Sequence, residues 1–121
     1  FRKPGGYRRP TSDQRALSLI EKDDQARWFR AMWTDVPGSS RDRGHPAPFP
    51  LEVASRLIRM FSFVGDVVLD PFLGTGTTTG AAMEANRSSV GYEIEEEYFR
   101  IVQERFAQLR TGVELQFLRS K

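Results

Sequence analysis

The chain has 121 residues, of which 39% are hydrophobic and 28% are charged, and its net charge at neutral pH is +2. This length allows one domain at most, with a modest hydrophobic core. The sequence holds no cysteine and one histidine, which excludes disulfides and thiolate metal sites, and we expect no metal. Because no apolar run approaches the roughly 18 residues of a membrane span, we expect no membrane contact and a cytoplasmic protein.

The basic side chains gather in the first third of the chain. Residues 1–45 carry ten Lys and Arg against six acids, whereas residues 46–121 carry eight against ten. The first ten residues contribute four cations and no acid: Arg2, Lys3, Arg8 and Arg9. With glycines between them, these cations can form a flexible arm that lies on nucleic-acid phosphates. The alternative is a solvated, frayed chain end.

Two helices are expected at the start of the chain. Thr11 or Ser12 can cap a helix that continues to about Lys22, and a second helix is expected from about Asp24 to Trp33. The second helix carries an apolar cluster of four residues: Trp28, Phe29, Met32 and Trp33. Such a cluster packs into a core more often than it offers a stacking platform for bases.

The remainder of the chain alternates helices and strands. Apolar residues recur at helical spacing from Leu51 to Phe61, which predicts an amphipathic helix. Strands are expected at residues 67–69, 88–94 and 113–118, with helices at about 77–85 and from 95 until Gly112. This alternation predicts an α/β fold, part of a doubly wound Rossmann-like sheet with an N-terminal helical segment. A ligand would lie at the C-terminal ends of the strands.

The first of these strands runs into the turn Asp-Pro-Phe-Leu-Gly-Thr-Gly-Thr-Thr, which begins at Asp70. Gly74 and Gly76 let the backbone bend and approach a ligand closely, because neither carries a Cβ. A helix that begins near Thr77 directs its free N–H groups and its positive dipole end at that ligand. The second strand ends in Glu93, where a carboxylate can accept hydrogen bonds from two ribose hydroxyls. The pattern predicts a site for a cofactor that contains adenosine.

The chemistry of the turn narrows the choice of cofactor. Gly80 comes one residue too late for the dinucleotide fingerprint, and no lysine lies between Lys22 and Lys121 to serve a phosphate loop. Without a cation at the turn, a polyphosphate fits poorly. A zwitterionic amino-acid tail fits better, with its ammonium group near Asp70, and S-adenosyl-L-methionine joins such a tail to an adenosine. The alternative is an ordinary turn that binds no ligand.

Several linked motifs resemble those of the amino-group DNA methyltransferases, which form N6-methyladenine or N4-methylcytosine. The turn from Asp70 to Thr78 resembles their cofactor motif, and His-Pro-Ala-Pro-Phe-Pro at 45–50 resembles the motif before it in permuted members. Residues 90–94 resemble the ribose-binding strand that follows, and residues 97–105 resemble the next helix. Because the motifs occur in the family's order, together they are more specific than any one alone.

The resemblance implies a role for each candidate site residue. It assigns cofactor contacts to His45, Pro46, Asp70, Phe72, Gly74, Gly76, Thr77, Thr78, Glu93 and Ile94. In that assignment Asp70 holds the methionine ammonium, Glu93 binds the ribose and Ile94 lies against the adenine. His45 would close the amino-acid end of the pocket, although a lone loop histidine can instead bond a backbone carbonyl. The candidates for DNA contacts, Arg2, Lys3, Arg8 and Arg9, rest on the charge of the first ten residues instead.

The resemblance divides the chain into a basic arm and helical segment, 1–44, and the S-adenosylmethionine-binding half of a methyltransferase domain, 45–121. The family's catalytic motif is Asp, Asn or Ser before Pro-Pro and an aromatic residue, and this chain has no Pro-Pro pair. In the permuted order that motif would precede Phe1. We therefore expect the C-terminal part of a longer enzyme, with no catalytic residue in this chain and no activity alone. A missing N-terminal catalytic part or a partner subunit would complete it.

For the whole enzyme the resemblance implies methyl transfer from S-adenosyl-L-methionine to a base flipped out of double-stranded DNA, at N6 of adenine or N4 of cytosine. The residues do not indicate which base is methylated, or whether the enzyme serves a restriction-modification system. One alternative is a methyltransferase of related fold that acts on RNA or a small molecule, although the motif at 45–50 favours DNA. Another is a non-catalytic subunit that binds the cofactor.

Overall fold

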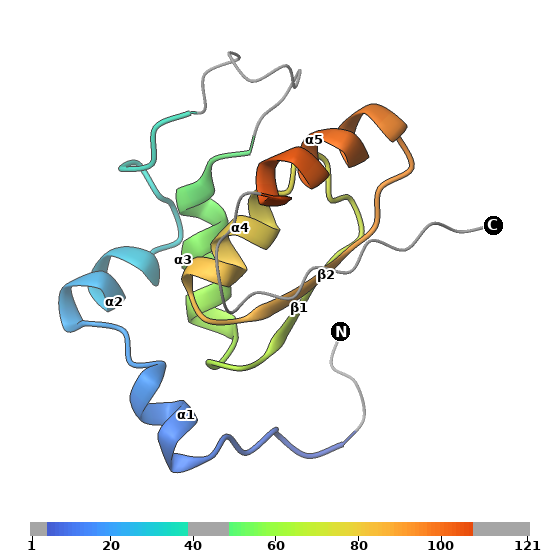
Figure 1. The fold of residues 1–121 in the computed structure, drawn as a ribbon. Coiled ribbons are helices and arrows are strands. Elements are labelled where there is room, and N and C mark those ends of the chain that lie inside the picture. The colour runs from blue at the N-terminus through green and yellow to red at the C-terminus, as the bar shows by residue number, and fades with distance from the viewer. Residues whose placement is uncertain (1–4, 39–48, 108–121) are drawn as a thin grey trace.

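A computed structural model describes residues 5–38 and 49–107 of the chain. Figure 1 shows the elements in those two ranges: α1 (Ser12–Leu17), α2 (Lys22–Trp28), α3 (Leu51–Phe61), β1 (Val67–Asp70), α4 (Thr77–Glu84), β2 (Ser88–Gly91) and α5 (Glu96–Ala107). No helix within these ranges is long and apolar enough to cross a membrane. The strand predicted at 113–118 and the helix end predicted at Gly112 lie outside the described residues.

The two strands pair in parallel and α4 connects them, which confirms the strand–helix–strand unit predicted from the sequence. Their register places Val67 beside Ser88 and Asp70 beside Gly91, so the two strands end together. β2 stops at Gly91, three residues before the predicted end. β1 ends at Asp70, the partner of Gly91, so β1 offers β2 no strand residue to pair with beyond that point. The α/β class is therefore confirmed, with a small parallel sheet as its centre.

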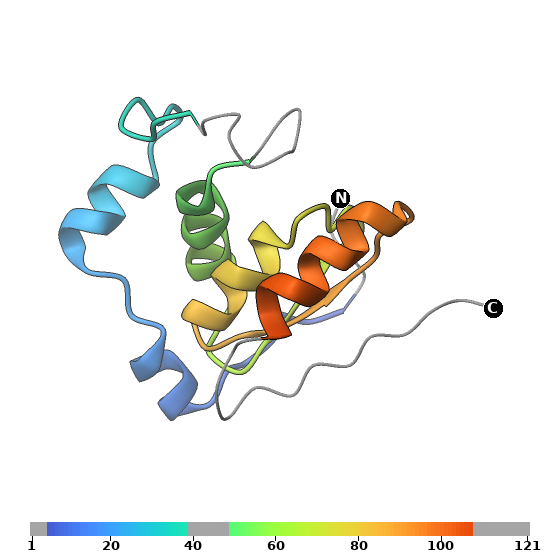
Figure 2. The ribbon, with the colours of Figure 1, turned by 45° about the horizontal axis from the view of Figure 1, so that its top comes forward.

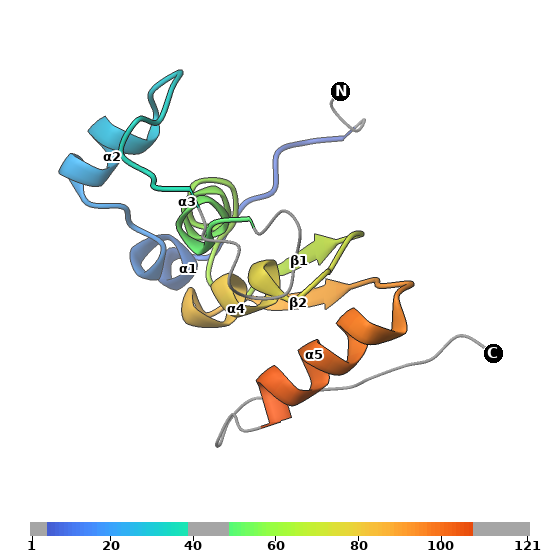
Figure 3. The ribbon, with the colours of Figure 1, turned by 90° about the horizontal axis from the view of Figure 1, so that it is seen from above.

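The core lies between the sheet and the pair α3 and α4, which Figure 3 shows side by side on one side of the strands. Its buried members are small or branched: Ala54, Ile58, Ala81 and Ala82, with Val68 and Ala85 against them. The alanines of α4 let the α3 backbone approach closely, and Val68 enters from the strand. The predicted amphipathic helix is therefore present, and its face toward α4 is buried.

Part of the apolar surface stays open among the described residues. Val67 and Leu69 point to the face of β1 away from the core and are 66% and 63% exposed, and Val90 beside them is 46% exposed. On α3, Leu57 and Phe61 are exposed as well. Strands of a parallel sheet are normally buried on both faces. Among the described residues, therefore, only one face of the two-stranded sheet is covered.

The N-terminal helices are shorter than predicted, and α1 ends at a tertiary contact. Thr11 is the cap: its hydroxyl accepts the N–H of Gln14 at 3.1 Å, and the Gln14 side chain accepts the N–H of Thr11 at 3.1 Å. The helix predicted to reach Lys22 ends at Leu17, since the next hydroxyl, that of Ser18, accepts the N–H of Val64 at 2.8 Å. This bond and the one from Gln14 Nε2 to the Val64 carbonyl, at 3.0 Å, dock α1 on the loop that precedes β1.

The second helix ends at Trp28 rather than at Trp33, because the chain folds back on itself. The indole N–H of Trp33 donates to the Trp28 carbonyl at 2.7 Å, which satisfies one of the carbonyls that the helix end leaves open. Of the apolar cluster predicted on this helix, Trp28 is buried, while Phe29 and Met32 are exposed. Only part of that cluster therefore packs as predicted within the described residues.

Arg56 joins this N-terminal segment to α3. Its guanidinium is buried and donates two hydrogen bonds to Asp35, at 3.0 and 2.9 Å, and one to Glu52 at 2.8 Å. The rings of Trp28 and Trp33 lie 5.9 and 5.2 Å from it, close enough for cation–π attraction. Bonding to Arg56 holds the pKa of the Asp35 carboxyl below its ordinary value. A bidentate, desolvated arginine of this kind fixes one segment against another.

The pH dependence of stability tests this junction. Because Arg56 lowers the pKa of Asp35 below 3.8, ionised Asp35 stabilises the fold above that pH, and the effect is lost as the pH falls through the folded pKa. We expect Asp35→Asn to lower the melting temperature at pH 7 and to approach the parent protein in acid. Glu104→Gln, an exposed change on α5, is the control and should leave the melting temperature unchanged. A gap that does not vary with pH would contradict the assignment.

Candidate functional site

The turn between β1 and α4 has the backbone conformation that its glycines predict. Gly74 and Gly76 have φ of 53° and 79°, in the left-handed region. The N–H of Gly76 donates to the Leu73 carbonyl at 2.9 Å, and the N–H of Leu73 donates to the Tyr92 carbonyl at 2.9 Å. The first bond closes the loop on itself and the second ties it to the chain after β2. We call residues 71–76 the glycine loop.

Asp70 and Glu93 lie on either side of the glycine loop, as the parallel register requires. Asp70 ends β1, and its Oδ1 accepts the N–H of Phe72 at 3.0 Å. Glu93 follows β2, and its Oε2 accepts the N–H of Gly74 at 2.7 Å. The other Glu93 oxygen accepts the N–H groups of Ile94 and Glu95, at 2.8 and 2.9 Å. The structure therefore brings together the two carboxylates and the loop that the sequence selected.

The first turn of α4 presents N–H groups beside these carboxylates. The helix begins after Gly76, which has no side chain to cap it, so no side chain within the described ranges caps its first N–H groups. These belong to Thr77, Thr78 and Thr79, because the bond that opens the helix runs from the Gly80 N–H to the Gly76 carbonyl at 3.0 Å. Uncapped N–H groups at a helix N-terminus favour an anion.

Two large apolar side chains are exposed, one in the glycine loop and one after β2. Phe72 is 87% exposed and Ile94 is 95% exposed. Large apolar side chains with so little protein contact offer surfaces to a flat or apolar ligand, or to further protein. The resemblance assigns Phe72 to the methionine part of the cofactor and Ile94 to its adenine. The ligand contacts themselves stay predictions.

The remaining predicted site residues divide into two groups. His45, Pro46, Arg2 and Lys3 lie outside the described residues. Arg8 forms an ion pair with Asp66, at the start of β1 and so at the end of the strand remote from the glycine loop. Arg9 is exposed. Burial alone would raise the pKa of Asp66, but the Phe63 N–H and Arg8 outweigh it and hold that pKa below its ordinary value.

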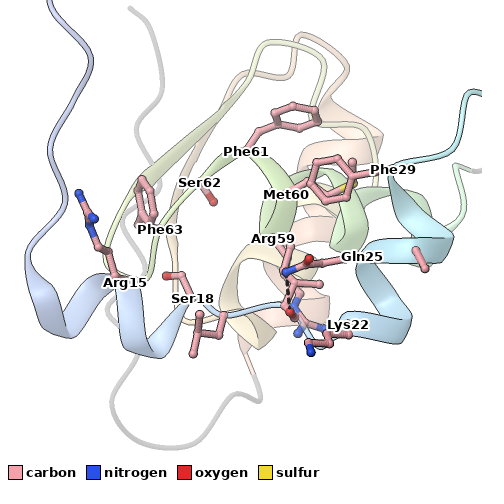
Figure 4. A pocket seen from close by; sticks show the side chains of 13 residues that line it. Arg15, Ser18, Lys22, Gln25, Phe29, Arg59, Met60, Phe61, Ser62 and Phe63 are labelled. Atoms are coloured by element: carbon pink, nitrogen blue, oxygen red, sulfur yellow. Dashed lines mark hydrogen bonds between the residues drawn. The ribbon is translucent and has the colours of Figure 1, made fainter.

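One hollow in the described ranges lies away from the loop. It measures about 1190 Å³ and separates α1 and α2 from the end of α3, with Phe29, Arg59 and Phe61 in its wall (Figure 4). A smaller hollow of about 340 Å³ lies between α3 and β1. Neither hollow contains Asp70, Gly74 or Glu93 in its lining. The candidate site is therefore identified by the carboxylates and free N–H groups around the glycine loop and not by the size of a cavity.

Sequence reasoning missed the contribution of α5. Arg105 reaches the glycine loop from 30 residues away, and its Nη1 donates to the Thr75 carbonyl at 2.8 Å. The expectation that no cation lies at the turn is therefore wrong. The residues of the turn itself include no Lys or Arg, but in the folded chain Arg105 lies beside it. Figure 2 shows α5 beside α4, which brings this arginine to the loop. The available signal was the cation Arg105 directly before Phe106, an aromatic residue that the structure buries.

Comparison with known sequences gives a consistent result. The sequence model of the N6/N4 methyltransferase family, described as DNA methylase, matches residues 2–104. Over 120 residues the chain is 43% identical to the type II methyltransferase M.MjaI of Methanocaldococcus jannaschii, covering 93% of this chain and 38% of that enzyme. Over 114 residues it is 41% identical to the type II methyltransferase M.MthZI of Methanothermobacter thermautotrophicus, covering 87% of this chain and 32% of that enzyme.

A solved structure shares the fold as well. A protein of Thermus thermophilus, assigned as a DNA modification methylase and solved in complex with S-adenosyl-L-methionine, superposes with a TM-score of 0.77. It is 54% identical in sequence, and the match covers 88% of this chain and 41% of that chain. The chain thus spans about a third to two fifths of the length of these relatives.

Substitution of Gly76 tests the geometry of the loop. A Cβ there would meet the Phe106 ring at 2.7 Å, and the φ of 79° strains any L side chain. We expect Gly76→Ala to destabilise the protein by about 1–3 kcal/mol in chemical denaturation. Gly38→Ala is the matched control, because no atom lies within 4 Å of its Cβ position and its φ is not left-handed. Equal stability of the two variants would show that the loop is not constrained as described.

Proposed function

Since the chain belongs to the N6/N4 family of DNA methylases, we propose that it is the cofactor-binding part of a site-specific DNA methyltransferase. The whole enzyme would transfer a methyl group from S-adenosyl-L-methionine to the exocyclic amine of adenine (N6) or cytosine (N4) in double-stranded DNA. The observation that carries the proposal is the placement of Asp70 and Glu93 on either side of the glycine loop.

The charges around the loop match the amino-acid end of S-adenosyl-L-methionine. That end carries an ammonium and a carboxylate, which need an anion and a set of N–H donors. Asp70 supplies the anion: one oxygen is committed to the Phe72 N–H, and the other can receive the ammonium. The first-turn N–H groups of Thr77 and Thr78 supply the donors, with the positive end of the α4 dipole behind them. Gly74 and Gly76 shape the loop between them.

The adenosine end would lie against the chain that follows β2. Glu93 would accept hydrogen bonds from the ribose hydroxyls, and Ile94 would cover the adenine. A carboxylate has about four acceptor positions, and three N–H groups already use Glu93. Glu93 would therefore bind the ribose with its one remaining acceptor position, or would release the Gly74 N–H so that a second position becomes free for the ribose. Exposed Phe72 would cover the methionine part, and His45 and Pro46 would close the pocket.

The cofactor supplies a methyl group that is already activated by its sulfonium charge. This chain would bind and orient it and keep water from it, whereas the base and its catalytic contacts fall to residues elsewhere. The sequence contains no Pro-Pro pair, and we assign no catalytic residue to it. Arg2, Lys3, Arg8 and Arg9 would contact DNA phosphates, and Arg8 would have to exchange Asp66 for a phosphate.

The open side of the sheet supports the proposal that further protein completes the enzyme. Val67 and Leu69 leave the face of β1 away from the core exposed. An N-terminal catalytic part, or a partner subunit, would cover this surface and add strands to the free edge of β1. Until it does so, we expect the chain alone to bind no DNA base productively and to transfer no methyl group.

Calorimetric titration with S-adenosyl-L-methionine tests the cofactor assignment. We expect Asp70→Asn and Glu93→Gln each to weaken binding at least about tenfold, because each removes a charge-assisted contact. Glu104→Gln, on an exposed position of α5, is the control and should bind like the parent protein. Binding of NAD in place of S-adenosyl-L-methionine would overturn the proposal, as would unchanged affinity in both site variants.

Transfer of a labelled methyl group tests the substrate assignment. We expect the full-length protein to label duplex DNA at an exocyclic amine and to leave RNA unlabelled. Digestion to nucleosides would then separate N6-methyladenine from N4-methylcytosine. Cofactor binding without transfer to any nucleic acid would favour the alternative, a non-catalytic subunit that binds the cofactor. Labelling of RNA alone would favour an RNA methyltransferase.

A further inference from the structure

Arg105 makes a contact with the glycine loop that the proposed cofactor contacts do not require. Its Nη1 donates to the Thr75 carbonyl at 2.8 Å. The N–H on the other end of the same peptide group, that of Gly76, donates to the Leu73 carbonyl at 2.9 Å. Because a peptide group is planar, these two bonds fix the orientation of the whole unit. The peptide between Thr75 and Gly76 is thus held from both sides.

The packing around Arg105 keeps it in place. Its guanidinium lies 5.3 Å from the Phe106 ring centroid, and the Phe106 ring in turn lies against Gly76, where a Cβ would meet it at 2.7 Å. Gly80 of α4 lies beside the guanidinium, since a Cβ at that position would meet Nη2 at 3.4 Å, an ordinary van der Waals distance.

We propose that Arg105 is a positioning residue for the cofactor site. The peptide that it holds leads directly into α4, so its orientation sets where the N–H groups of Thr77 and Thr78 point. Glu93 holds the Gly74 N–H from the β2 side, and Arg105 holds the Thr75 carbonyl from the α5 side. Two contacts from different elements thus shape the loop before a ligand binds. A loop already in its binding conformation loses less entropy when the ligand arrives.

This inference rests on the proposed function, because the consequence of loop position is measured as affinity for the cofactor. The experiment uses the full-length protein and compares three variants: Arg105→Gln, Arg105→Lys and Arg100→Gln. Arg100 is exposed on the same helix, and Arg100→Gln removes the same charge as Arg105→Gln, so this variant is the matched control. Each variant is titrated with S-adenosyl-L-methionine and, separately, with duplex DNA in the absence of cofactor. Thermal melting reports the stability of each.

We expect Arg105→Gln to raise the dissociation constant for S-adenosyl-L-methionine roughly three- to tenfold, as for loss of one exposed charge-assisted hydrogen bond. Arg105→Lys should recover part of the affinity, because its ammonium can still donate to the Thr75 carbonyl. Arg100→Gln should bind the cofactor like the parent protein, and the affinity for DNA should not differ between Arg105→Gln and Arg100→Gln.

Two results would overturn the assignment of Arg105 alone. One is unchanged cofactor affinity in Arg105→Gln. The other is a lower melting temperature with equal losses of cofactor and DNA affinity, which would indicate a merely structural role. Failure of the parent protein to bind S-adenosyl-L-methionine would instead overturn the proposed function, and this inference with it. The parent titration therefore separates the two failures.

Discussion

The parallel pairing of β1 with β2 determines where the described candidate cofactor residues lie. Because both strands end at the same edge, Asp70 and Glu93 come to the two sides of one turn, although 23 positions separate them in the sequence. The crossover through α4 adds the N-terminus of a helix at the same edge. An antiparallel pairing would place these two strand ends at opposite edges of the sheet. The strand topology, more than any one side chain, therefore determines where the candidate site lies.

Close packing of small residues makes this arrangement possible. Ala81 and Ala82 bring α4 against α3, while Gly76 lets the Phe106 ring of α5 lie beneath the loop. The loop is thus supported by the strands on one side and by α5 on the other, with hydrogen bonds from Leu73 and Arg105 as fixed points. Apolar packing places the elements, and a few polar contacts then set the direction of the backbone donors.

The sequence predicts a structural feature well where the type and spacing of nearby residues determine it. The apolar run of β1, the glycines at positive φ and the Thr11 cap were all recognisable from residue type and spacing. The end of α1 was not, because the Ser18–Val64 bond acts across the fold, and the end of α2 was not, because the chain folds back there and the Trp33 indole bonds the Trp28 carbonyl. Arg105 was missed for the same reason: its contact depends on where α5 returns. Sequence therefore reveals the glycine loop, and the three-dimensional arrangement reveals what holds it.

Amide chemical shifts measured by NMR during addition of S-adenosylhomocysteine would test directly whether the glycine loop is the cofactor site. We expect the largest shifts at Gly74, at Thr77 and Thr78, and at the amides that Glu93 accepts, those of Ile94 and Glu95. Each of these N–H groups would gain, lose or exchange a partner when the ligand binds. Shifts confined instead to the larger hollow, at Phe29 and Phe61, would contradict this assignment and move the site to the surface between α2 and α3.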